Sequence, residues 1–234
     1  MKKENNEISP ILYSEEEMGA IENHIENYFG KFAEVFHEIV SPDIHVDICV
    51  VNPTKERNYY TLVTMGMGAH IMNVPKEWRN NNTRSEILVS LPPDWKIKSN
   101  NESDYWPLRW LKILARLPIN EDTWLGWGHT VPNGEPFAEN TQLSGVILEL
   151  PYTFGEESMT CKLPNGDVVN FYQMIPLYEE EMNYKVKHGT DELFEKFDDD
   201  FTPVLDIHRR NYLTTNAGKP EKLRLWHKLW KKNK

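Results

Sequence analysis

Three residues with the side chains of a cysteine-protease relay alternate along one apolar stretch of the chain. His45, Asp47 and Cys49 place an imidazole, a carboxylate and a thiol on what we expect to be one face of a β-strand. Residues two apart on a strand are separated by about 6.8 Å, and residues four apart by about twice that distance. A nucleophile and its base must lie within about 3 Å of each other. The spacing therefore argues against catalysis and predicts that His45 and Cys49 are separate surface or packing residues.

The segment Gly66-Met67-Gly68 is the nearest approach to a phosphate-binding loop. A third glycine of the dinucleotide fingerprint would fall at position 71, which is Ile71, so we expect a flexible turn after a strand instead. The chain contains no HExxH helix, Walker A sequence, GxSxG elbow or paired CxxC motif, and its histidines show no ligand spacing. These patterns predict no catalytic residue, no metal and no cofactor.

The segment Thr123–Phe137, TWLGWGHTVPNGEPF, combines two Trp, three Gly, two Pro and one His without helical or strand periodicity. Glycine allows sharp bends, proline fixes them, and large rings must pack on something. The pattern predicts an ordered loop that either closes one end of the core or binds a partner. A different hypothesis is an enzyme of unknown chemistry with His129 in a pocket lined by Trp124 and Trp127, although no second positioned group is evident.

Four helices are expected to support these residues. Ser14 to Phe29 begins with a capping box formed by Ser14 and Glu17 and ends at Gly30. The other three are 104–117, which Pro118 is expected to end, 176–188 with acidic first turns, and 190–197, which Thr190 is expected to cap.

Strands are expected at 35–40, 43–51, 59–65, 84–91, 144–150, 160–163 and 168–173, the last two joined by the hairpin turn Pro164-Asn165-Gly166-Asp167. Strands and helices follow each other without regular alternation or internal repeats. This order predicts an α+β fold with a mixed or antiparallel sheet.

Charge divides the chain into parts. Residues 219–234 carry seven Lys or Arg and one Glu, whereas residues 1–218 carry 19 basic and 35 acidic residues. We expect one compact domain over 1–213, a linker over 214–220 and a basic amphipathic tail over 221–234, in which Leu223, Trp226, Leu229 and Trp230 form an apolar stripe. The tail could lie on an anionic membrane surface, but docking on the acidic body is the favoured interpretation.

The acidic body makes nucleic acid an unsuitable partner and a basic protein a suitable one. Cys49 and Cys161 are too few for a disulfide framework, and the lysines of the N-terminus are followed by no apolar run. We therefore expect reduced thiols and a cytoplasmic protein.

Five long blocks in consistent order resemble the suppressor of fused family, and most closely its bacterial branch. They are YYTLVTMGMGAHIMNVP (59–75), RSEILVSLPPDW (84–95), WPLRWLKILARLP (106–118), TWLGWGHTVPNGEPFAENTQLSGVIL (123–148) and DVVNFYQMIPLYEEEMNYKVKHG (167–189). The resemblance implies a single α+β domain similar to the amino-terminal lobe of the animal protein. That protein is a non-enzymatic regulator that grips a short extended peptide between two lobes.

The resemblance also implies a function and a site. Bacterial members are often proposed as immunity proteins, so we expect a non-enzymatic binding domain that neutralises a toxin or effector. Motif match assigns Trp127, Gly128 and His129 to a partner surface, and the neighbouring Trp124 completes this candidate site. A membrane-surface adaptor acting through the tail remains a further alternative.

Overall fold

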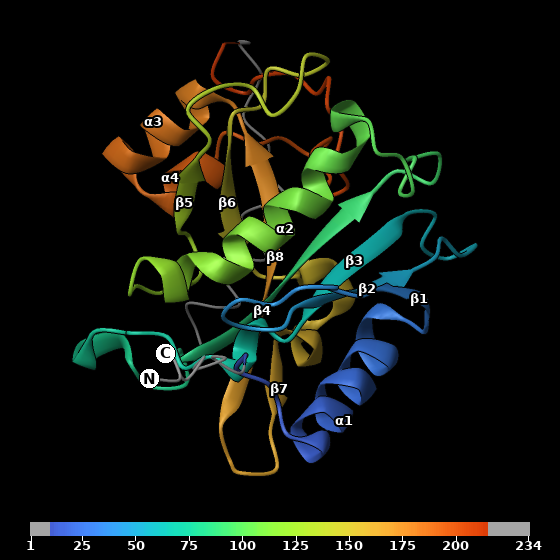
Figure 1. The fold of residues 1–234 in the computed structure, drawn as a ribbon. Coiled ribbons are helices and arrows are strands. Elements are labelled where there is room, and N and C mark those ends of the chain that lie inside the picture. The colour runs from blue at the N-terminus through green and yellow to red at the C-terminus, as the bar shows by residue number, and fades with distance from the viewer. Residues whose placement is uncertain (1–9, 215–234) are drawn as a thin grey trace, which may run out of the picture.

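A computed structural model describes residues 10–214 of the chain, built on an eight-stranded sheet (Figure 1). The strands run in the order β1-β2-β3-β4-β8-β6-β5, and β7 pairs with β8. β4 and β8 are parallel, and the other pairings between the eight named strands are antiparallel. The predicted α+β class with a mixed sheet is confirmed. The strands are β1 Phe32–Phe36, β2 Asp47–Val51, β3 Tyr60–Met65, β4 Arg84–Leu91, β5 Thr130–Pro132, β6 Gly145–Glu149, β7 Thr160–Lys162 and β8 Val168–Leu177.

Helices cover both faces of this sheet (Figure 1). The α2 helix, Glu102–Asn120, packs on one face. The α1 helix, Glu15–His24, and the π-helical turn Ile25–Phe29 that follows it pack on the other. The helices α3, Glu179–His188, and α4, Thr190–Phe194, form a third apolar cluster with β6 and β8. The predicted capping box of Ser14 and Glu17 is confirmed at the start of α1.

Burial on both faces explains why β2 is apolar at consecutive positions. Ile48 and Val50 pack in the cluster beneath α2, whereas Cys49 and Val51 pack in the cluster beneath α1. All five residues of the strand are buried. The successive side chains of a strand point to opposite faces, so a sheet between two helical layers needs no polar face.

The first predicted strand is displaced. It runs over Phe32–Phe36, and Ile39 and Val40 lie outside it with 98% and 76% of their surface exposed. The backbone leaves the sheet at Glu38, whose N–H donates to the carboxylate of Asp47 at 3.0 Å. The Glu38 carboxylate in turn forms an ion pair with Arg116 of α2. These polar contacts, rather than apolar alternation, end the edge strand.

Two prolines were expected at helix ends and are found inside longer elements. Pro118 lies within α2, where the Glu121 N–H still donates to the Leu117 carbonyl at 3.0 Å. Pro176 lies within β8, beyond the point where β4 pairs with that strand, so no hydrogen-bond donor is needed on that side. Helix α3 consequently begins at Glu179. The fourth helix ends at Phe194, and its N-cap is Gly189 rather than Thr190.

A buried carboxylate stands at the centre of the sheet. Glu86 of β4 has no exposed surface. Its Oε1 accepts hydrogen bonds from the Tyr13 hydroxyl at 2.8 Å and from the N–H groups of Gly66 and Gly68 at 3.0 Å each. Its Oε2 accepts from the Thr64 hydroxyl at 2.6 Å. The loop that resembles a phosphate loop in sequence therefore does bind an acidic group, which is a side chain of the same protein.

Both glycines of this loop are required by close packing. Gly66 has φ +127°, and a Cβ atom there would lie 2.0 Å from the carbonyl oxygen of His45. A Cβ atom on Gly68 would lie 2.1 Å from the Tyr13 hydroxyl. The absence of side chains lets the backbone amides reach Glu86.

We predict that Glu86→Ala destabilises the protein by about 3–5 kcal/mol, because several buried donors lose their acceptor. Glu86→Gln keeps one acceptor oxygen, so we expect a loss of about 1–2 kcal/mol. Urea unfolding followed by circular dichroism measures both. Glu22→Ala, an exposed substitution on α1, is the control and should change stability little. A loss below about 1 kcal/mol in Glu86→Ala would show that the cluster contributes little to folding.

Candidate protein-interaction site

The predicted site residues lie together immediately before β5. The rings of Trp124 and His129 meet edge to face, with centroids 4.3 Å apart, and both residues are half-buried. Burial lowers the pKa of His129, nearby Lys185 of α3 lowers it further, and a hydrogen bond to the Trp124 backbone opposes the shift. The imidazole is therefore neutral at pH 7, and it packs as an aromatic ring.

Trp127 and Gly128 are tied to the neighbouring strand and helix. The Trp127 Nε1–H donates to Oε1 of Glu149 at 2.7 Å, and the Gly128 N–H donates to the Leu148 carbonyl at 2.7 Å. Gly128 has φ +75°, and a Cβ atom there would lie 2.6 Å from the Thr190 hydroxyl of α4. These contacts hold the loop rigidly against β6.

The same loop closes one end of the core. Leu125 and Phe137 are buried in the cluster beneath α2. Phe137 stacks on Trp106 with ring centroids 4.4 Å apart, and meets Trp110 edge to face at 4.9 Å. The loop is thus a lid for the core, and Trp124, Trp127 and His129 are half-buried in it.

Of the three alternating residues His45, Asp47 and Cys49, the structure brings the first two together. His45 Nε2 lies 3.0 Å from Asp47 Oδ1, so the expected separation of these two side chains is wrong. The regular strand begins only at Asp47, and the strand spacing does not apply before it. Cys49 is fully buried, and burial, followed by nearby Glu86, raises its pKa to about 12. A thiol in that state is inert as a nucleophile.

Among residues 10–214, no group of three or more His, Cys, Asp or Glu side chains is arranged to hold a metal ion. No helix in this part of the chain has the length and apolar character needed to span a membrane.

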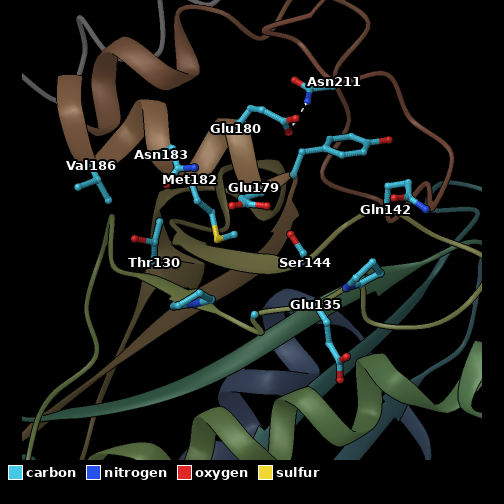
Figure 2. A pocket seen from close by; sticks show the side chains of 14 residues that line it. Thr130, Glu135, Gln142, Ser144, Glu179, Glu180, Met182, Asn183, Val186 and Asn211 are labelled. Carbon is cyan, nitrogen blue, oxygen red and sulfur yellow. Dashed lines mark hydrogen bonds between the residues drawn. The ribbon is translucent and has the colours of Figure 1, made fainter.

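A cavity of about 630 Å³ opens between β5 and α3 (Figure 2). Thr130 and Ser144 line it from the β5–β6 side, and Met182 and Asn183 line it from α3. Met182 packs closely on β6, since a Cβ atom on Gly145 would lie 2.0 Å from its sulfur. The absence of a side chain at Gly145 lets α3 sit close to the sheet and form the cavity floor.

The mouth of the cavity is acidic. Glu135, Glu179 and Glu180 are exposed and line it, and none of the described residues that line it is Lys or Arg. The Asn211 side chain donates to Glu180 at 2.9 Å and closes the far rim (Figure 2). Such a cavity suits a cationic side chain next to an apolar one.

A buried ion pair fixes the helix that supplies two of these carboxylates. Glu181 is fully buried in α3 and accepts from Arg209 at 2.8 Å, while its other oxygen accepts from the Tyr178 N–H as a helix cap. The Arg209 guanidinium also lies 5.0 Å from the centre of the Tyr178 ring. This pair anchors α3 to the chain segment that ends at Thr214.

The family model "Suppressor of fused protein (SUFU)" matches residues 42–210. The chain belongs to the suppressor of fused family. The resemblance inferred from the five sequence blocks is thereby confirmed. The uncharacterized protein UU111 of Ureaplasma parvum serovar 3 is 30% identical to this suppressor of fused domain over 204 residues, which cover 86% of this chain and 98% of that protein.

Solved structures of the suppressor of fused family share the fold. A homologue from Neisseria gonorrhoeae has a TM-score of 0.62 at 19% identity, with coverage of 85% of this chain and 98% of its own. The structure of the Sufu-Fu complex has a TM-score of 0.62 at 12% identity, with coverage of 88% of this chain and 94% of that chain. The structure of Drosophila Suppressor of Fused has a TM-score of 0.59 at 12% identity, with coverage of 85% of this chain and 52% of that one.

The cavity residues were missed by sequence reasoning. None of Trp124, Trp127, Gly128 and His129 lines the cavity, although Thr130, the next residue, does. The run Glu179 to Glu181 was interpreted only as a helix start. The one available signal was three consecutive glutamates, of which a single residue is needed for the capping box.

Glu149 predicts a pH dependence of stability. Burial, opposed by hydrogen bonds from Leu150, Trp127 and Tyr152, raises its pKa to about 7. The folded state therefore favours the protonated acid, and its stability falls as pH rises from about 4.5 to about 7 and stays lower above that. Glu149→Gln keeps an acceptor for Trp127 but cannot ionise.

We expect the stability of Glu149→Gln relative to the parent to rise by about 3 kcal/mol between pH 5 and pH 8. Urea unfolding at both pH values measures this difference. Glu139→Gln, an exposed substitution with no such burial, is the control and should show no comparable change. A parent–variant difference that is the same at both pH values would contradict the assignment.

Proposed function

We propose that this suppressor of fused domain binds a basic segment of a partner protein in the cavity between β5 and α3. The observation that carries the proposal is the three exposed carboxylates of Glu135, Glu179 and Glu180 around a floor that includes Met182. An apolar floor with an acidic mouth gives a lysine or arginine both a surface for its alkyl chain and a counter-charge. This role needs no catalytic group.

The aromatic loop extends this surface. Thr130 lines the cavity, and His129 precedes it directly in the chain. We propose that the exposed edges of Trp124, Trp127 and His129, placed by the buried Gly128, contact the partner beside the cavity. Rings held by packing lose little conformational freedom on binding, and such residues commonly anchor protein interfaces.

We further propose that the partner is a toxin or effector that this protein neutralises in the cytoplasm. Residues 1–218 have a large excess of acidic side chains, and acidic charge accelerates capture of a basic protein. Toxin domains that attack nucleic acids are commonly basic, so an acidic inhibitor would compete with their substrate. The two buried free cysteines, Cys49 and Cys161, are consistent with a reducing compartment.

Glu179→Gln/Glu180→Gln tests the acidic mouth. We take the toxin or effector to be the product of the gene next to the one that encodes this protein. We expect the double variant to bind that product about tenfold more weakly, mainly through slower association at low salt. Surface plasmon resonance at two salt concentrations measures the affinity and both rate constants. Growth of cells that express both proteins shows whether neutralisation is lost in parallel.

Glu15→Gln/Glu16→Gln is the matched control. It removes the same charge from the first turn of α1, and leaves the capping Glu17 in place as the test variant leaves Glu181. Equal binding by the two double variants would exclude the cavity mouth as the site. A neighbouring gene product that is not toxic alone, or that is neither bound nor neutralised, would contradict the toxin hypothesis.

A further inference from the structure

We infer that the basic C-terminal segment, residues 219–234, docks intramolecularly in the cavity between β5 and α3, so that a partner must displace it. The inference deepens the proposed function, because it names a regulator of the same site. The proposed occupant of the cavity is a segment of this chain that lies outside the described residues.

The cavity lies close to the point in the chain where the described residues end. Asn211 lines the cavity, and the described residues end three positions later at Thr214. The buried pair of Arg209 and Glu181 and the buried Tyr212 hold this stretch against α3. The chain therefore leaves the described domain at the rim of its acidic cavity.

Reach and effective concentration follow from this position. Eight residues separate Thr214 from Leu223, and an extended chain of that length spans up to about 26 Å. A ligand joined by so short a tether is present at an effective concentration in the millimolar range. Even weak complementarity then leaves the cavity occupied for most of the time.

Residues 219–234 and the cavity are complementary in charge and in apolar surface. Residues 219–234 carry seven Lys or Arg and one Glu, and Leu223, Trp226, Leu229 and Trp230 lie among them. The cavity presents Glu135, Glu179 and Glu180 at its mouth and the apolar surfaces of Met182 and Val186 within. Val186 is 76% exposed on the cavity lining, so its apolar surface is open to a covering segment.

A fluorescence experiment on the full chain tests the inference. Asn183→Cys places a bimane label on the cavity wall, and Asn23→Cys places one on an exposed position of α1 at the other end of the sheet (Figure 1). The native Cys49 and Cys161 are buried, which favours labelling of the new thiol. Tryptophan quenches bimane only at short range, so Trp226 and Trp230 act as internal reporters.

Trp226→Phe/Trp230→Phe should raise emission from the label at position 183 by about twofold and leave emission at position 23 unchanged, because a tethered segment is docked for most of the time. Glu179→Gln/Glu180→Gln should raise emission at position 183 in the same way, and the matched Glu15→Gln/Glu16→Gln should not. High salt should release part of the quenching.

Unchanged emission at position 183 after Trp226→Phe/Trp230→Phe would overturn the inference. Quenching that grows with protein concentration would assign the cavity to the segment of a second copy, which also overturns it. Sedimentation of the full chain with phosphatidylserine vesicles, together with an unquenched label at 183, would assign the segment to membranes instead. The readout needs no partner, so its result is separate from the success or failure of the neutralisation test.

Discussion

The carboxylate of Glu86 is the interaction on which the rest of the fold depends. It lies on the central strand of the sheet with no exposed surface, and it accepts hydrogen bonds from Tyr13, Thr64, Gly66 and Gly68. These donors come from the segment before α1, from β3 and from the loop after β3. Burial raises the pKa of Glu86, and the hydrogen bonds oppose that shift. One acidic group on β4 thus binds two stretches of chain, one at Tyr13 and one over residues 64–68, that are far apart in sequence.

The sheet centred on Glu86 determines where the cavity and the aromatic loop lie. Its interior strands are covered on both faces by α1, α2 and the α3–α4 pair, so little of the sheet surface is available. The short strand β5 stands at one end of the strand order, beside α3. The cavity and the rings of the preceding loop therefore gather at that end. Rigid packing beneath them, such as the stack of Phe137 on Trp106, holds this surface in one shape.

Local sequence patterns predicted most of the elements but not their limits. The capping box of Ser14 and Glu17 and the turn before β8 have strong local signatures, and both are found where expected. The boundaries predicted from Pro118 and Pro176 were wrong, because the helix and the strand that contain these prolines tolerate the missing backbone N–H donor there. Glu86 was not recognised as a structural centre, since its four donors come from other elements. The cavity was missed for the same reason: Thr130, Ser144, Glu179 and Asn211 meet only once β8 and α3 have folded together.

The contact between Gly145 and Met182 limits how the shape of the cavity can differ among related proteins. Any larger residue at Gly145 would collide with the thioether of Met182, so the Met182 side chain would have to leave its place at the base of the cavity. The base of the cavity is therefore determined by this packing contact, whereas Glu135 and Glu179 are exposed at its mouth and Glu180 accepts a hydrogen bond from Asn211 there. Substitutions at the exposed Glu135 and Glu179 are therefore expected to change the charge of the cavity mouth with little loss of stability. The depth of the cavity thus depends on packing in the fold, whereas the charge at its mouth can differ between related proteins.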